Sequence, residues 1–96
     1  MIVLGANLLV DFSTKHSGAK GALDAWRNEV ASVTCCWRTT HDIKARYPSA
    51  SLLANNRVIF NIKGNDYRLV VTVRYQGGIV VVEWVGTHAE YDKKSF

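Results

Sequence analysis

The stretch RVIFNIKGNDYRLVVTVRYQGGIVVVEWV, residues 57–85, decides the fold of this 96-residue chain. Within it, hydrophobic residues alternate with polar or charged ones, a pattern typical of strands whose two faces differ. The alternating runs cover residues 57–63, 67–75 and 79–85. The separators Gly64-Asn65-Asp66 and Gln76-Gly77-Gly78 have the composition of tight hairpin turns. Because tight turns join strands that run in opposite directions, the stretch predicts an antiparallel meander.

The residues that precede this stretch predict mainly helices. The expected elements are a short strand at residues 1–4, helices beginning at Asn7, near Ala22 and at Thr39, and another strand at residues 51–54. In the second helix, apolar residues recur every three or four positions through Trp26 and Val30 to Val33, which indicates a helix lying on a sheet. We therefore expect an α+β fold, with the N-terminal helices packed on one face of an antiparallel β-sheet. No linker or repeat interrupts residues 1–96, so we expect a single domain.

Composition allows several classes of protein. The chain is 48% hydrophobic and 21% charged, which is ordinary for a folded domain, and no apolar run approaches the ~18 residues of a membrane helix. Its net charge of +4 is compatible with a nucleic-acid partner and equally with an ordinary basic protein.

Adjacent Cys35 and Cys36 cannot easily form a relaxed disulfide with each other. A reducing cytoplasm fits this usage, and we expect both thiols to be buried at a helix end.

The alternation also predicts which side chains share the polar face of the sheet. If the helices cover the wholly apolar side, the other side collects Arg57, Asn61, Lys63, Arg68 and Arg74. Such a set could cradle a phosphodiester backbone, or it could simply be the solvated face of a one-sided sheet. By the same alternation we expect Glu83 on this face, paired with one of the cations, and Trp84 in the core.

The heptapeptide GTHAEYD, residues 86–92, follows the last strand and contains candidate chemistry. Thr87 and Glu90 have the spacing of a capping box, which predicts a short helical turn. That turn would place His88 and Tyr91 on one face. A histidine titrates near pH ~6.5 and can transfer protons, while a phenol ring can stack on a base. The other two histidines, at positions 16 and 41, lack such partners, and no metal-ligand spacing or phosphate-binding loop is evident.

Several of these segments resemble one protein family. The string FNIKGN followed by YRL at residues 60–69, and GTHAEYD at residues 86–92, are similar to the HigB family of type II toxin–antitoxin toxins. Residues 42–44 and 47–50 add to the resemblance. It is strongest from Asp42 onward and weak across residues 13–36. The family belongs to the RelE-like superfamily, whose helices-then-sheet fold agrees with the order of elements expected here.

The resemblance implies an activity and partners. Members are endoribonucleases (mRNA interferases) that cleave mRNA, typically on the ribosome, without a metal or cofactor. The 2′-hydroxyl attacks the adjacent phosphate and leaves a 2′,3′-cyclic phosphate and a 5′-hydroxyl. A cognate helix-turn-helix antitoxin, HigA-like, blocks the activity, and the pair represses its own operon. In line with the composition, we expect a cytoplasmic protein without a membrane partner.

The resemblance also implies roles for particular residues. Arg68 and Lys63 would bind the scissile phosphate, His88 would act as acid or base, and Tyr91 would stack on or orient a nucleotide. The further RNA-binding candidates are Arg57, Arg74, Asn61, Asn65 and Lys93. The two asparagines are also expected to fix the Lys63 loop, and Glu90 and Asp92 to hold the cap.

Glu83 departs from the family pattern, because many relatives carry a basic residue at that place. A carboxylate would repel the phosphate, so two other readings stay open. If His88 and Arg74 do not suffice for catalysis, the chain is a catalytically weak or degenerate toxin that still binds antitoxin or RNA. The other alternative is a purely structural domain without RNA affinity. The weak or degenerate toxin predicts that Glu83→Arg creates toxicity that the native chain lacks.

Overall fold

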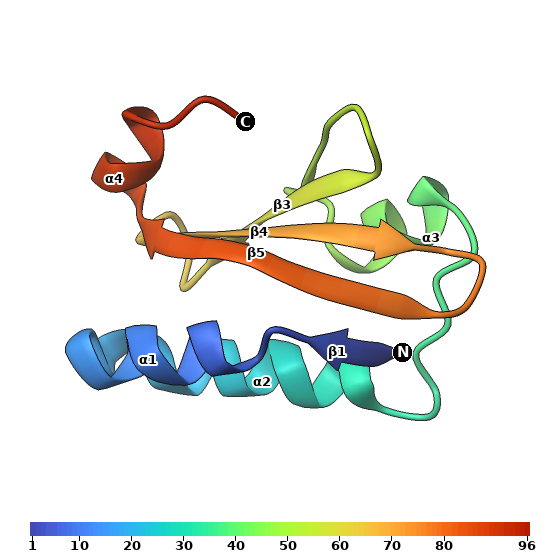
Figure 1. Ribbon diagram of the computed structural model, residues 1–96, viewed down its shortest axis with the longest axis horizontal. Coiled ribbons are helices and arrows are strands. Elements are labelled where there is room, and N and C mark those ends of the chain that lie inside the picture. The colour runs from blue at the N-terminus through green and yellow to red at the C-terminus, as the bar shows by residue number, and fades with distance from the viewer.

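Two layers form the molecule, which a computed structural model describes over residues 1–96 (Figure 1). The elements are β1 (Ile2–Leu4), α1 (Asn7–Lys15), the 3₁₀ turn η1 (Ser17–Ala19), α2 (Lys20–Ala31), α3 (Thr40–Arg46), β2 (Ser51–Leu52), β3 (Arg57–Ile62), β4 (Tyr67–Arg74), β5 (Ile79–Thr87) and α4 (His88–Asp92). Helices α1 and α2 lie along one side of the sheet, and α4 stands on the other side (Figure 1). The expected α+β fold, with the N-terminal helices on one face, is confirmed.

The sheet has the strand order β1-β5-β4-β3-β2. The pairs β3–β4 and β4–β5 are antiparallel, as the two hairpin turns predict, and β2–β3 is antiparallel as well. Strand β1 joins the edge of β5 in parallel, from Ile2 beside Ile79 to Leu4 beside Val81, so the sheet is mixed. The helices and the strands β2, β3 and β4 all lie between β1 and β5 in the chain. A connection of this length leaves the strand direction free, whereas a tight turn does not.

A β-bulge in β5 changes which side chains face the helices. Val71 pairs with Val82 and the preceding Val70 pairs with Trp84, so Glu83 is an extra residue in the ladder. Val82 and Val85 therefore both face the helices although they are three positions apart. Trp84 lies on the opposite face and is only half-buried, so the expectation of a core tryptophan is wrong. Simple alternation failed here because it assumed an unbroken period of two.

The main core lies between the sheet and the helices. It contains 16 buried side chains, with Phe60 of β3 near its centre. The Phe60 ring lies 5.5 Å from Trp26 of α2, 5.8 Å from Trp37 and 5.0 Å from Tyr47. Rings at these distances add favourable edge-to-face and offset contacts to the area they bury. This one-sided core leaves the other surface of the sheet, here called the open face, without a helical layer apart from α4.

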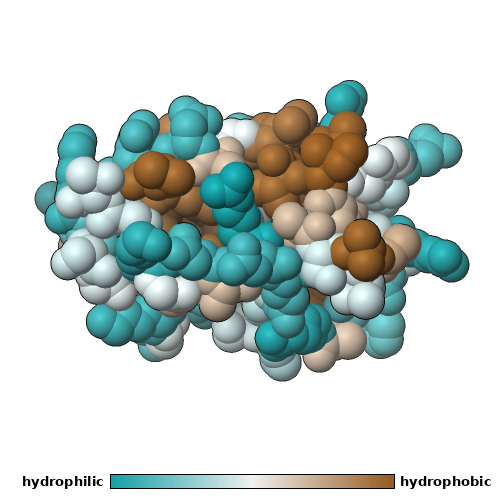
Figure 2. Space-filling view, turned by 90° about the horizontal axis from the view of Figure 1, so that it is seen from below, coloured by the Kyte–Doolittle hydropathy of each residue, from teal (hydrophilic) through white to brown (hydrophobic).

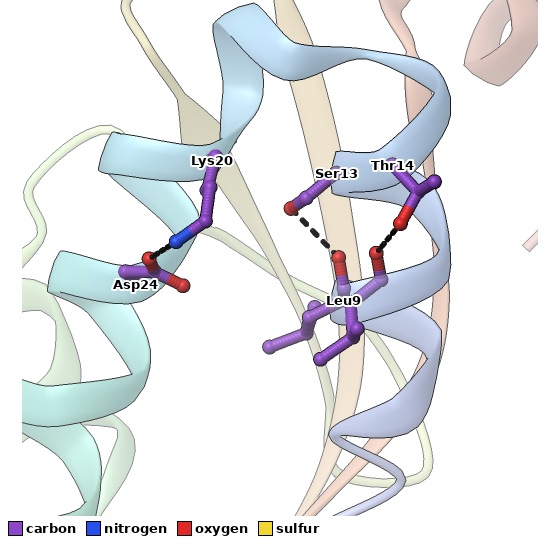
Figure 3. Close-up of polar contacts among 6 residues, drawn as sticks. Leu9, Ser13, Thr14, Lys20 and Asp24 are labelled. Atoms are coloured by element: carbon purple, nitrogen blue, oxygen red, sulfur yellow. Dashed lines mark hydrogen bonds and ion pairs between the residues drawn. The ribbon is translucent and has the colours of Figure 1, made fainter.

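Helices α1 and α2 satisfy several of their polar groups locally (Figure 3). The hydroxyl of Ser13 donates to the carbonyl of Leu9 at 2.8 Å, and that of Thr14 donates one residue further along, to Val10, at 3.0 Å. At the start of α2, Lys20 and Asp24 form an ion pair of 2.6 Å. These contacts stay within one helix, so they satisfy polar groups locally and leave the apolar stripes to join the layers.

Helix α2 is shorter than the apolar spacing indicates. It ends at Ala31, and Val33, expected to continue its stripe, is fully exposed in the following loop. Cys35 is half-buried and Cys36 is exposed, so the expectation that both thiols are buried is wrong for Cys36. Burial raises the pKa of the Cys35 thiol, which keeps it in the neutral form.

A glycine allows the close turn from β1 into α1. Gly5 has a φ of +79°, and a Cβ at this position would lie 2.8 Å from the carbonyl oxygen of Val82. Any other residue would strain the backbone and push α1 away from the sheet.

The underside of the molecule shows apolar surface in separate patches among hydrophilic side chains (Figure 2). The large apolar side chains most exposed near β1 and α1 are Ile2 (60%), Leu4 (49%) and Val10 (56%). None of the helices has the length and apolar character that crossing a membrane would need.

Candidate functional site

Helix α4 is fixed to the end of β5 by the predicted capping box. The Thr87 hydroxyl accepts from the backbone N–H of Glu90 at 3.1 Å, and the Glu90 carboxylate accepts from the backbone N–H of Thr87 at 2.8 Å. The second of these bonds lowers the pKa of Glu90, because it stabilises the carboxylate form. Two otherwise unpaired N–H groups are satisfied, and the helix starts at His88.

We predict that Thr87→Ala lowers the free energy of unfolding by about 0.5–2 kcal/mol, since it removes the hydroxyl acceptor of this cap. The bond from Thr87 to the Glu90 carboxylate adds to the free energy of unfolding at any pH above the ordinary carboxyl pKa. This contribution is lost as pH falls through the lowered pKa of Glu90 in the folded state. Urea unfolding from pH 7 to pH 3 measures both effects. In Glu90→Gln the acid-dependent part should be smaller, and an unchanged pH profile in that variant would contradict the charge-based account.

His88 lies at the first turn of α4 with its side chain about half exposed. Its Nε2 is 3.3 Å from Oδ1 of Asp92, one helical turn later, and its backbone N–H donates to the Asp66 carbonyl at 3.1 Å. Asp92 was expected to hold the cap, and it lies beside the imidazole instead. The four-residue spacing was the sequence signal for this contact. A carboxylate next to an imidazole can fix the ring orientation for proton transfer.

Arg68 and Tyr91 are brought together on the open face. The Arg68 guanidinium carbon is 6.0 Å from the centroid of the Tyr91 ring. One guanidinium nitrogen donates to the backbone carbonyls of Asn65 at 3.2 Å and Tyr67 at 3.3 Å. Arg68 forms no ion pair, so its remaining N–H groups are free to bind an anion. Asn65 thus contributes through its backbone carbonyl, and its role in binding RNA stays a prediction.

Lys63 does not join Arg68. Strand β3 ends at Ile62, and Lys63 has a φ of +53° in the following turn, so the alternation no longer applies to it. Its ammonium nitrogen lies 3.4 Å from where a Cβ on Gly18 would be, and the Tyr67 hydroxyl lies at the same distance from that point. The expectation that Lys63 shares the open face is therefore wrong, because its side chain reaches η1 on the helical side. Its catalytic role stays a prediction.

His16 lies at the same end of the sheet as Lys63. Its ring stacks on Phe12 with a centroid distance of 4.3 Å and is 6.2 Å from the ring of Tyr67. The only sequence signal for this position is that His16 directly precedes the Ser17-Gly18 break between the two helices. Residues distant in sequence thus gather on the helical side of the strand ends, while Arg68 and Tyr91 occupy the other side.

The remaining cations spread along the open face. Arg57 pairs with Thr72 across the strands, and Arg74 ends β4 opposite Ile79. Arg74 is six residues from Arg68 on the same strand, or about 20 Å at about 3.3 Å per residue. Neither Arg57 nor Arg74 forms an ion pair. These side chains form a track along the face and do not converge on one point.

Two further RNA-binding candidates lie near the α4 end of this track. Asn61 pairs with Arg68 across the strands, and its side-chain amide donates to the Ser49 carbonyl at 3.3 Å. It therefore ties β3 to the segment before β2 and not to the Lys63 loop as expected. Lys93 is exposed directly after α4. Their contacts with RNA stay predictions.

Glu83 lies on the open face, as expected, but it does not pair with a cation. The Thr72 hydroxyl donates to its carboxylate at 2.7 Å. Thr72 is four residues from Arg68 on β4, or about 13 Å at about 3.3 Å per residue. Solvent-exposed charges this far apart interact weakly at physiological salt, where the screening length is about 8 Å.

A second polar cluster lies between α2 and α3. The Tyr47 hydroxyl and the Arg46 guanidinium both donate to the Glu29 carboxylate, the latter at 2.6 Å. These bonds, the one from Tyr47 first, lower the pKa of Glu29, and burial together with the Glu29 contact raises that of Tyr47. A hollow of about 300 Å³ lies beside the cluster. Its groups satisfy one another, which indicates a structural link between the helices.

No group of three or more His, Cys, Asp or Glu side chains is placed to hold a metal ion. What the open face offers near α4 is an imidazole with a carboxylate beside it, a guanidinium without a charge partner and a phenol ring. These groups suit proton transfer and anion binding.

Comparison with known protein families matches residues 19–94 to HigB_toxin, described as the RelE-like toxic component of a toxin-antitoxin system. No curated protein matches the chain. The matched residues include all of the sheet except β1, together with α2, α3 and α4, and so every side chain of the candidate site. The chain therefore belongs to the HigB toxin family, the RelE-like toxic components of toxin–antitoxin systems, which act with an antitoxin partner.

Proposed function

We propose that this toxin is an endoribonuclease that cleaves mRNA, with the ribosome as the place where the substrate is presented. The observation that supports it most is the placement of His88, Arg68 and Tyr91 at the α4 end of the open face. Family membership supplies the toxin role, and these three side chains supply groups that phosphodiester cleavage needs.

The proposed reaction uses only the RNA and the side chains of the protein. The 2′-hydroxyl loses its proton, and its oxygen attacks the adjacent phosphorus. The bond to the 5′ oxygen breaks and that oxygen gains a proton, which leaves a 2′,3′-cyclic phosphate and a 5′-hydroxyl. His88 transfers one of these protons, and Asp92 orients its ring. Arg68 stabilises the negative charge that develops on the phosphate oxygens.

Binding of the RNA strand is assigned to the rest of the open face. Arg57 and Arg74 contact phosphates that precede or follow the scissile one, and Lys93 contacts the strand beside α4. Positively charged side chains that neutralise phosphates make affinity fall as salt rises. Tyr91 stacks on or orients a nucleotide next to the scissile bond.

Growth and RNA-end mapping test the proposed activity. Induction of the chain without its antitoxin should stop growth and produce mRNA fragments with 2′,3′-cyclic phosphate and 5′-hydroxyl ends. Co-expression of the antitoxin should restore growth. Growth arrest without such fragments would contradict the endoribonuclease and leave a toxin that acts by binding.

A non-catalytic toxin is the second candidate, because Glu83 places a carboxylate on the open face. Its carboxylate is bound by Thr72, which is about 13 Å from Arg68 along β4, so it should repel a phosphate at Arg68 only weakly. Glu83→Arg decides between the two candidates. If the native chain is inactive and this variant cleaves RNA, the second candidate holds. If both cleave RNA at similar rates, Glu83 lies outside the reaction.

A further inference from the structure

Three aromatic rings gather on the open face beside α4. The ring of Trp84 lies 6.3 Å from Tyr91 and 5.6 Å from Phe96, and the rings of Tyr91 and Phe96 are nearly parallel, 5.8 Å apart at 11°. Trp84 and Tyr91 are half-buried, and Phe96 is 38% exposed. The rings therefore form a cluster that solvent and a ligand can reach.

This cluster is separate from the main core. None of its three residues belongs to the group of 16 buried side chains between the sheet and the helices. Trp84 faces outward only because of the bulge at Glu83. The lack of a side chain on Gly86 makes room for it, since a Cβ there would lie 2.4 Å from the edge of the indole. The backbone thus holds a tryptophan ring on the face that carries the cations.

Charge around the cluster favours an anionic ligand with a flat ring. The Arg68 guanidinium lies 6.0 Å from the Tyr91 ring and the Lys94 ammonium 5.9 Å from the Trp84 ring, and neither cation has a carboxylate partner. The nearby Glu90 carboxylate is engaged by the backbone N–H of Thr87. Aromatic platforms next to unpaired cations are the arrangement with which proteins bind single-stranded nucleic acid.

We propose that Trp84 and Phe96 extend the site into a second base-binding subsite, in which an unpaired nucleobase of the RNA stacks on Trp84. The inference rests on the proposed function and deepens it. Arg68 holds the phosphate on one side of this nucleotide and Lys94 the phosphate on the other. Because every base has a π-face, the subsite contributes affinity and position, with little dependence on sequence.

Fluorescence and affinity measurements with a short single-stranded RNA test the subsite. Trp26 and Trp37 are 3% and 5% exposed, so a change of tryptophan emission on adding RNA reports on Trp84. Trp84→Leu, which keeps an apolar but smaller side chain and removes the π-face, should weaken binding about 5- to 100-fold. The slope of log affinity against log salt should stay the same, because no phosphate contact is lost.

Controls separate the subsite from folding and from the proposed function. Trp84→Phe retains a smaller ring and should lose less affinity than Trp84→Leu, and both variants are checked by thermal unfolding. Arg27→Ala, on an exposed part of α2, should leave binding unchanged. Native affinity and slope in Trp84→Leu, or unchanged emission when RNA binds, would overturn the subsite alone. No salt-dependent binding by the native chain would overturn the subsite and RNA as the substrate together.

Discussion

His88→Ala is expected to lower the rate of RNA cleavage by about 10²- to 10⁴-fold, the range that a positioned acid or base contributes. The imidazole is about half exposed and its Nε2 lies 3.3 Å from the Asp92 carboxylate, so the ring is both accessible and oriented. Single-turnover cleavage of a defined mRNA measures the effect. Binding of RNA should change little, because the imidazole is assigned to proton transfer.

A histidine in another part of the molecule provides the matched control. His41 is exposed in α3 and lies outside the proposed site, so His41→Ala should cleave at the native rate. Asp92→Asn keeps the shape of the carboxylate but removes its charge, and it should lose less activity than His88→Ala. Cleavage by His88→Ala at the native rate would remove this side chain from the mechanism.

Arg68→Ala is expected to reduce cleavage by about 10²- to 10³-fold, as found when one group that stabilises transition-state charge is removed. The backbone carbonyls of Asn65 and Tyr67 hold the guanidinium, so it is positioned before RNA arrives. Arg68→Lys should recover only part of the rate, since an ammonium lacks the planar set of donors that matches two phosphate oxygens. The measurement is the cleavage rate at saturating RNA.

Arg74→Ala distinguishes charge in the reaction from charge along the track. Arg74 is about 20 Å from Arg68 along β4, so its loss should act on binding. We expect weaker affinity and a salt slope reduced by about 0.7 for one phosphate contact on single-stranded RNA. If Arg74→Ala and Arg68→Ala had the same effect on the rate at saturating RNA, the assignment of Arg68 to the scissile phosphate would fail.

Local sequence signals predicted most of the secondary structure and the cap of α4. The hairpin turns and the capping box of Thr87 and Glu90 each depend on residues within a few positions of one another. Such interactions are encoded by neighbouring residues, and the local structure that they favour agrees with the packing of the folded chain. The antiparallel order of β3, β4 and β5 followed directly from the two turns.

Features that depend on distant pairing were not predictable from alternation. The direction of β1 is set by its contact with β5, about 75 residues away in the chain, and nothing near Ile2 specifies it. The side on which Lys63 lies depends on where β3 ends and on its left-handed backbone. For Lys63, the period of two was extended past the end of β3, where the strand geometry stops.

The bulge at Glu83 also affects how members of this family should be compared. One inserted residue reverses inward and outward positions for everything that follows it on the strand, so Trp84 and Gly86 face outward only in chains that have the insertion. A gap-free alignment with a relative that lacks it would match outward residues of one chain to inward residues of the other. A cation that the family resemblance leads one to expect at this place corresponds to Glu83 only if the strand of the relative is bulged as well. Sequence comparisons across this strand should therefore treat residue 83 as a gap position until the pairing of each relative is known.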